Sequence, residues 1–441
     1  MSEKTYPSIN DLTLEEKASL TSGGDAWHLQ GVEAKGIPGY MITDGPHGLR
    51  KSNSATTGEV DLNNCVPATC FPPAAGLSSS WNPELIHQVG EAMAEECIQE
   101  KVAVILGPGV NIKRNPLGGR CFEYWSEDPY LAGHEAIGIV AGVQSKGVGT
   151  SLKHFAAINQ ETDRLRISAN ISQRALREIY FPAFEHIVKE AQPWTIMCAY
   201  NCINGVHAAQ DHWLLTDVLR DEWGFQGIVM SDWGADHDRV ASLNAGLNLE
   251  MLPSYTDDQI VYAARDGRIQ PAQLDHMAQG MIDLVNKTRA AMSIENYRFD
   301  IEAHDEVAHQ AAIESMVLLK NDDAILPIAG DAKVTVIGEF ARTPRYQGGG
   351  SSHITPTKMT SFLDTLTERG VDAKFAPGFT LDLEPADPAL EAEAVDAAKG
   401  ADVVLMFLGL PEAAESEGFD RETLDMPAKQ IALLEAVAAE N

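Results

Sequence analysis

The sequence predicts an α/β protein, with an N-terminal (β/α)8 TIM-like barrel followed by a partial α/β sandwich domain. Short apolar runs alternate with amphipathic runs from residue 40 to about residue 290. This alternation is typical of parallel strands joined by crossover helices. Repeated over about 250 residues, it favours a closed barrel. The alternation of apolar and amphipathic runs stops near residue 292 and then resumes, which predicts a second α/β unit.

The apolar runs of the first part predict strands at residues 40–43, 102–106, 150–152, 195–199, 228–230 and 247–250. Helices are expected between them at residues 83–101, 130–145, 173–191 and 213–223. Asn82 and Pro83 mark the start of the first helix, because asparagine caps a helix N-terminus and proline fits its first turn. Long segments separate the early strands, so we expect irregular strands there.

The division that follows is a barrel over residues 1–291, a linker over 292–304 and a sandwich domain over 305–441. In that domain we expect helices at 305–320, 359–369, 388–399 and 428–440, and strands at 334–337, 373–376 and 403–408. The last helix of a doubly wound domain normally leads into another strand. The sandwich is therefore expected to be truncated at its C-terminus, or completed by a second chain or segment.

Composition narrows the classes of function. The chain has 64 acidic and 33 basic residues and a formal charge of −31, which disfavours nucleic acid and anionic membranes as partners. Residues 1–8 lack the pattern of a signal peptide, so the expected location is cytoplasmic. The cysteines are scattered and are expected to be free thiols. Without CxxC pairs or a His-rich segment, a zinc site is not expected. No metal and no cofactor is predicted.

The best candidate for a catalytic carboxylate is Asp232. It follows the apolar run Gly227-Ile-Val-Met230, and the carboxyl ends of barrel strands form the active face. Trp233 beside it offers a flat apolar ring to a sugar. Taken alone, Asp232 is equally well explained as the cap of the following helix.

Other polar clusters also follow the predicted strands. Each has a purely structural explanation: Asp44 as a turn cap, Arg120 as a partner of Glu123 or Asp128, His154 and Tyr200 as core residues. Lys153 and Arg164 are explained in the same way, as partners of Glu161 and Asp163. Together, so many charged strand ends on one face are costly unless they are paired or used. A neutral polyol is the ligand that such a ring of groups suits.

The longest of these clusters are TDGPHGLR (43–50), GRCFEYWSEDP (119–129), KHFAAINQETDR (153–164) and MSDW (230–233). With these motifs the chain resembles glycoside hydrolase family 3, of the β-glucosidase type. The resemblance implies Asp232 as nucleophile and Glu417, in SEGFDR (416–421), as acid/base. It also implies a sugar-binding site made of Asp44, Arg120, Lys153, His154, Arg164, Met197, Tyr200 and Trp233.

The expected function is that of a retaining exo-acting β-glycosidase, most simply a β-glucosidase, acting on a small β-glucoside or oligosaccharide. Retention requires the two carboxyl groups about 5–5.5 Å apart, and Glu417 is expected to keep its proton at neutral pH. A β-xylosidase or arabinosidase of the same family is the alternative within this class. A non-catalytic sugar-binding fragment or subunit is the alternative outside it.

Overall fold

The computed structural model describes residues 8–53 and 64–441. Its largest sheet is parallel and has the strand order β1-β3-β4-β6-β9. The strands are β1 (Met41–Asp44), β3 (Val102–Leu106), β4 (Gly149–Phe155), β6 (Thr195–Cys198) and β9 (Ile228–Ser231). The predicted strands 102–106, 195–199 and 228–230 agree with these bounds to within one residue, because each is a continuous apolar run.

The sheet curls until its two ends meet. Beyond β9, the ring continues through isolated bridges from Met230 to Leu249 and from Ser22 to Glu250. Two antiparallel bridges, Gly23 to Leu29 and His28 to Met41, then lead back to β1. The prediction of a TIM-like barrel is therefore confirmed. The predicted strand at 247–250 forms only bridges, and the other isolated bridges of the ring involve residues 22–29, which precede the first predicted strand.

Side chains of the barrel strands alternate between two cores, as the period of a strand requires. Ile42, Val104, Met197 and Met230 belong to the core inside the ring. Their neighbours, including Ile105, Ile196 and Val229, belong to the core between the sheet and the helices. Both faces of the sheet are therefore buried, which explains why these strands read as continuous apolar runs.

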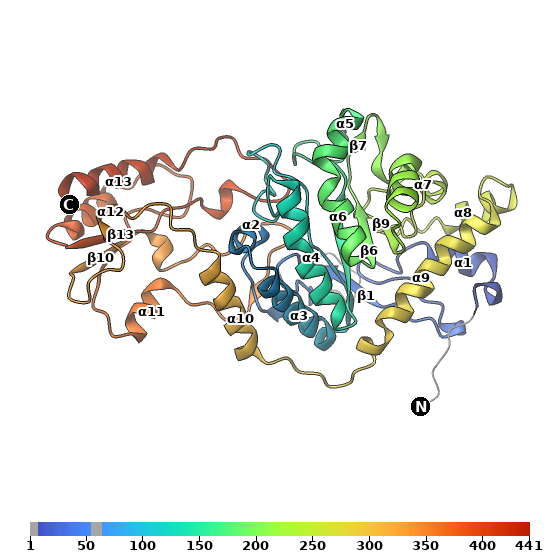
Figure 1. Ribbon diagram of the computed structural model, residues 1–441, viewed down its shortest axis with the longest axis horizontal. Coiled ribbons are helices and arrows are strands. Elements are labelled where there is room, and N and C mark those ends of the chain that lie inside the picture. Colours follow the sequence, from blue (N-terminus) through green and yellow to red (C-terminus); the bar gives the residue numbers. More distant parts are fainter. Residues whose placement is uncertain (1–7, 54–63) are drawn as a thin grey trace.

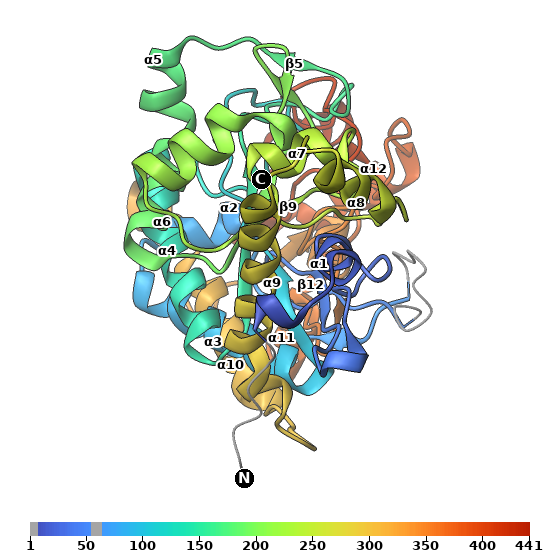
Figure 2. The same ribbon diagram turned by 90° about the vertical axis from the view of Figure 1, so that its right-hand side faces the viewer.

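Helices cover the outside of the barrel (Figures 1 and 2). They include α3 (Pro83–Glu100), α4 (Pro129–Ser145), α6 (Pro182–Ala191), α7 (Arg239–Ala245) and α8 (Asp257–Arg265). Helix α9 (Pro271–Met292) instead contributes Met281, Ile282 and Val285 to the same core as Ile42, Met197 and Met230. At the start of α3 the Asn82 side chain accepts a hydrogen bond from the Leu85 N–H, as its sequence predicted. The short helix α1 (Leu14–Leu20) packs on α8 and α9.

Two predicted helices are irregular. The helix expected at 173–191 consists of α5 (Gln173–Ala175), a π-helical turn (Leu176–Tyr180) and α6. Pro182 explains the break, because it lacks a donor and its ring clashes with the carbonyl of the preceding turn. The helix expected at 213–223 is π-helical over Trp213–Glu222.

The second α/β unit lies at the end of the molecule away from α7 and α8 (Figure 1). Its parallel sheet has the order β12-β10-β13, formed by β12 (Lys374–Ala376), β10 (Val334–Ile337) and β13 (Val403–Met406). Helices α11 (Phe362–Glu368), α12 (Pro388–Ala398) and α13 (Ala428–Glu440) accompany it. Ile337, Ala394 and Leu433 share its small core. This unit confirms the predicted α/β domain after the barrel.

Helix α10 (Ile301–Glu314) lies between the two units and packs on α3. It begins four residues before the predicted start, because the Asp300 side chain caps it by accepting from the Glu302 and Ala303 N–H groups. The three-part division at residues 291 and 305 stays a prediction. Within the described residues, no helix combines the length and apolar character needed to cross a bilayer.

Candidate active site

The carboxyl ends of the barrel strands deliver the polar residues to one place. Asp44 is the last residue of β1, and Lys153 and His154 lie near the end of β4. Tyr200 and Asp232 follow directly on β6 and β9, whose ends are paired in register through Cys198 and Ser231. Parallel strands end at the same edge of a sheet, so these side chains meet there.

They line a cavity of about 280 Å³, close to the lower limit for small-molecule sites. All ten residues predicted from the sequence lie in its wall, although their roles stay predictions. The lining residues are Trp27, Asp44, Arg120, Lys153, His154, Arg164, Met197, Tyr200, Asp232, Trp233, Gly350, Ser351, Glu417 and Gly418.

Asp232 is buried, and only one of its two carboxylate oxygens has a hydrogen-bond partner. Its Oδ1 accepts from the Trp233 N–H at 2.8 Å. Its buried Oδ2 accepts no hydrogen bond, and the nearest cationic or imidazole nitrogen is His154 Nε2 at 3.7 Å. Burial raises the pKa of Asp232, and the positive charges of Arg120 and Lys153 oppose that shift. The unpartnered oxygen is available to an incoming group.

Other buried polar groups line the same cavity as Asp232. Arg50 donates to Asp44 Oδ2 at 2.8 Å, and burial raises the pKa of Asp44 although Arg50 and Lys153 act against it. Burial and the charges of Arg120 and Lys153 hold the pKa of His154 well below its usual range, so its imidazole is neutral. The cavity therefore offers the Asp44 carboxylate, the Lys153 ammonium and the neutral His154 imidazole to hydroxyl groups.

Glu417 reaches the cavity from the second α/β unit and is held there by ion pairs. Its Oε1 lies 2.8 Å from Arg164 Nη1 and 3.5 Å from Arg120 Nη1. Its Oε2 accepts from the Ser351 N–H at 2.7 Å. Arg164 also pairs with Glu161 at 2.7 Å. Arg120 likewise pairs with Glu123 at 2.7 Å. Two of the pairings considered from the sequence, Arg120 with Glu123 and Arg164 with Glu161, therefore exist alongside the contacts with Glu417.

The expectation that Glu417 keeps its proton at neutral pH is wrong. Burial raises the pKa of Glu417, but the two guanidinium groups and the Ser351 N–H outweigh it and hold the pKa well below its usual range. Glu417 is therefore ionised at neutral pH. Nothing in the sequence indicated that Arg120 and Arg164 would contact Glu417, and the acid/base role of Glu417 stays a prediction.

Four cavity residues were not predicted. Trp27 lies against Trp233, with 5.6 Å between the ring centroids, and its motif was visible as GDAW at residues 24–27. Gly350 and Ser351 come from the glycine-rich loop 347–352. Gly350 has a φ of +106°, and a Cβ there would lie 2.4 Å from the Glu417 Cβ. The high glycine content of loop 347–352 was the feature of the sequence that could have indicated Gly350 and Ser351 as site residues.

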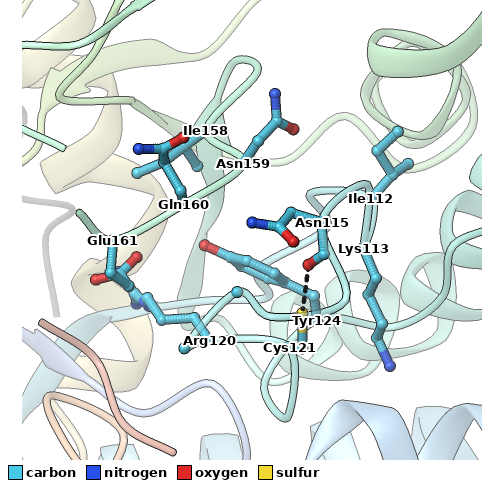
Figure 3. A pocket seen from close by; sticks show the side chains of 12 residues that line it. Ile112, Lys113, Asn115, Arg120, Cys121, Tyr124, Ile158, Asn159, Gln160 and Glu161 are labelled. Atoms are coloured by element: carbon cyan, nitrogen blue, oxygen red, sulfur yellow. Dashed lines mark hydrogen bonds between the residues drawn. The ribbon is translucent and has the colours of Figure 1, made fainter. Parts of the chain in front are cut away.

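A second, much smaller cavity of about 10 Å³ shares Arg120 with the first as a lining residue (Figure 3). Tyr124 lies in its wall and contacts His154 Nδ1 at 3.2 Å. Cys121 donates to the Asn115 carbonyl at 3.4 Å. This space has room for about one water molecule, so no substrate group fits there.

Comparison with known proteins places this arrangement in a class of two-domain glycosidases. The model of the glycosyl hydrolase family 3 N-terminal domain matches residues 52–284, and that of the C-terminal domain matches residues 316–441. The chain belongs to glycoside hydrolase family 3. It spans about 59% of the length of the curated relatives it matches first.

Three relatives carry informative names. The exo-α-(1→6)-L-arabinopyranosidase of Bifidobacterium breve is 86% identical over 100% of this chain and 59% of its own length. The crystal structure of a Bifidobacterium adolescentis β-glucosidase has 87% identity and a TM-score of 0.95, over 99% of this chain and 63% of that one. β-Glucosidase 3B from Thermotoga neapolitana, in complex with α-D-glucose, has 34% identity and a TM-score of 0.86, over 98% and 66%.

Proposed function

We propose that the protein is a retaining exo-glycosidase that removes one terminal pyranose from a neutral glycoside. The observation that supports this most strongly is the single cavity lined by Asp232 from the barrel and Glu417 from the second unit. Its small volume suits one sugar ring. The surrounding Asp44, Lys153 and His154 suit the hydroxyl groups of that ring.

In the proposed first step, Asp232 attacks the anomeric carbon through its unpartnered Oδ2. The bond to the leaving oxygen breaks, and the Glu417 carboxyl supplies the proton that this oxygen takes up. In the second step, Glu417 removes a proton from water, which attacks the same carbon and releases Asp232. Because Arg120 and Arg164 favour the ionised form of Glu417, this carboxyl must take up a proton before the first step.

Two sugars fit this chemistry. A β-D-glucopyranoside and an α-L-arabinopyranoside both present an equatorial glycosidic bond with equatorial hydroxyls at C2 and C3. They differ in the orientation of the hydroxyl at C4 and in the hydroxymethyl group that only glucose carries. The name of the B. adolescentis relative, a β-glucosidase, supports the first sugar. The name of the B. breve relative, an exo-α-(1→6)-L-arabinopyranosidase, supports the second. We propose β-D-glucosides as substrates, with α-L-arabinopyranosides as the second candidate.

A panel of 4-nitrophenyl glycosides tests this proposal. We expect kcat/KM to be highest for the β-D-glucoside or the α-L-arabinopyranoside and lower for the β-D-xyloside, and the α-D-glucoside should not be cleaved. Product configuration, followed by NMR during the first turnovers, should show retention. Inversion would contradict the retaining mechanism. If no glycoside is turned over but sugar binding is saturable, a non-catalytic sugar-binding protein would be the better description. The cytoplasmic location stays a prediction.

A further inference from the structure

Asp420 lies outside the cavity, three residues after Glu417, and all four of its hydrogen bonds cross to the barrel. Its Oδ1 accepts from the Glu161 N–H at 2.8 Å and from the Gly119 N–H at 3.2 Å. Its Oδ2 accepts from the Thr162 N–H at 2.9 Å and from the Thr162 hydroxyl at 2.7 Å. One carboxylate thus connects two barrel loops to the segment that carries Glu417.

Those two loops carry the residues that hold Glu417. Gly119 precedes Arg120, and Glu161 and Thr162 precede Arg164. Both guanidinium groups contact Glu417 Oε1. Asp420 therefore fixes the backbone of the arginine loops relative to the backbone of Glu417, without touching the sugar cavity itself.

The backbones also approach each other very closely here. A Cβ at Gly119 would lie 1.8 Å from the Phe419 carbonyl oxygen and 2.4 Å from the Ser416 carbonyl oxygen. The Arg421 N–H donates to the Leu117 carbonyl at 2.8 Å, and the Gly418 N–H donates to Glu161 Oε2 at 2.9 Å. Residues 416–421 thus lie directly on the barrel rim, with no space for a side chain at position 119.

We propose that Asp420 is a positioning residue that holds Glu417 at the glycosidic oxygen by clamping residues 416–421 to the arginine loops. This inference rests on the proposed function. A carboxylate is suited to the task because it only accepts hydrogen bonds, and all of its partners here are donors. Burial raises the pKa of Asp420, but the Glu161 and Thr162 donors outweigh it and lower the pKa below its usual 3.8.

Asp420→Ala removes all of these contacts, and Asp420→Asn replaces one acceptor oxygen by a donor. Asp387→Asn is the matched control, since Asp387 also accepts from a backbone N–H but at the start of α12, away from the site. We would compare kcat/KM for a dinitrophenyl glycoside, whose leaving group needs little protonation, with kcat/KM for a methyl glycoside of the same sugar. Hydrogen exchange at the Gly119, Glu161 and Thr162 amides would be measured alongside.

The expected result is that Asp420→Ala lowers kcat/KM for the methyl glycoside at least about tenfold more than for the dinitrophenyl glycoside. Exchange at the three amides should accelerate, and Asp420→Asn should fall between Asp420→Ala and wild type. Equal losses on both glycosides, or unchanged exchange, would overturn the positioning role. If the wild-type protein cleaves no glycoside, the proposed function fails, and unchanged exchange alone would then refute the clamp.

Gly119→Ala is an independent variant that leaves Asp420 in place. Its methyl group should push residues 416–421 away from the rim and reproduce the selective loss on the methyl glycoside. Gly330→Ala is its control, because nothing lies within 4 Å of a Cβ there. If the ratio of kcat/KM for the methyl glycoside to kcat/KM for the dinitrophenyl glycoside is the same in Gly119→Ala as in wild type, the proposed positioning role is contradicted.

Discussion

Asp232 and Glu417 face the same cavity, yet they are supported in opposite ways. Asp232 follows β9, whose backbone is paired in register with β6, and its side chain keeps one oxygen free. Glu417 lies on a loop, and both of its oxygens receive hydrogen bonds from residues far away in the sequence. The comparison teaches that strand pairing positions the proposed nucleophile, whereas long-range side-chain contacts position the proposed proton donor.

The largest effect is expected from replacing the carboxylate of Asp232, the proposed nucleophile. Asp232→Asn should lower kcat by at least about 10⁴-fold, because an amide cannot form the covalent intermediate. Circular dichroism and the thermal midpoint should stay close to wild type. The matched control is Asp211→Asn, a partly buried carboxylate outside the cavity, which should retain activity. Near-normal hydrolysis by the Asp232→Asn variant would refute the assignment of Asp232 as the nucleophile.

Removing the other carboxyl should have a smaller effect that depends on the substrate. Glu417→Ala should lower kcat/KM for alkyl glycosides about 10²- to 10⁴-fold and for dinitrophenyl glycosides much less. Added azide should restore turnover of the dinitrophenyl glycoside, because azide attacks the glycosyl-enzyme without a base and releases a glycosyl azide. Equal losses on both substrates would contradict the acid/base role.

Gly350 tests the packing behind Glu417. Gly350→Ala introduces a Cβ 2.4 Å from the Glu417 Cβ at a positive φ, so the loop must move. We expect about a 100-fold loss of kcat/KM on alkyl glycosides. The free energy of unfolding, measured by denaturant titration, should fall by about 1–3 kcal/mol. If the Gly350→Ala variant is as active as wild type, activity does not depend on the exact placement of the Glu417 side chain.

The smallest expected effect is a shift in pH dependence. Arg164 lowers the pKa of Glu417, so Arg164→Gln should raise it. The proton donor would then survive to higher pH, and the basic limb of the kcat/KM profile for alkyl glycosides should move up by about one pH unit. Arg166→Gln, at an exposed neighbouring arginine, should leave the limb in place. A downward shift would contradict the ion-pair assignment.

The same contrast explains what the sequence could predict. Asp232 was singled out because an apolar run ends just before it, and its role stays a prediction. The strand β3 was predicted with its observed bounds because it is a continuous apolar run. The ionised state of Glu417 was missed because Arg120 and Arg164 lie 297 and 253 residues away in the sequence. No local pattern reports such contacts. The π-helical segments and the bridges at Leu249 and Glu250 likewise depend on tertiary packing.

The most direct test of the two-carboxylate site is to trap the intermediate. A 2-deoxy-2-fluoro dinitrophenyl glycoside of the preferred sugar should inactivate the protein, since fluorine slows the release of the glycosyl-enzyme. Peptide mapping by mass spectrometry should place one sugar on Asp232, and Asp232→Asn should remain unlabelled. A label on another carboxylate, or full turnover of the normal substrate with no label at all, would contradict the account.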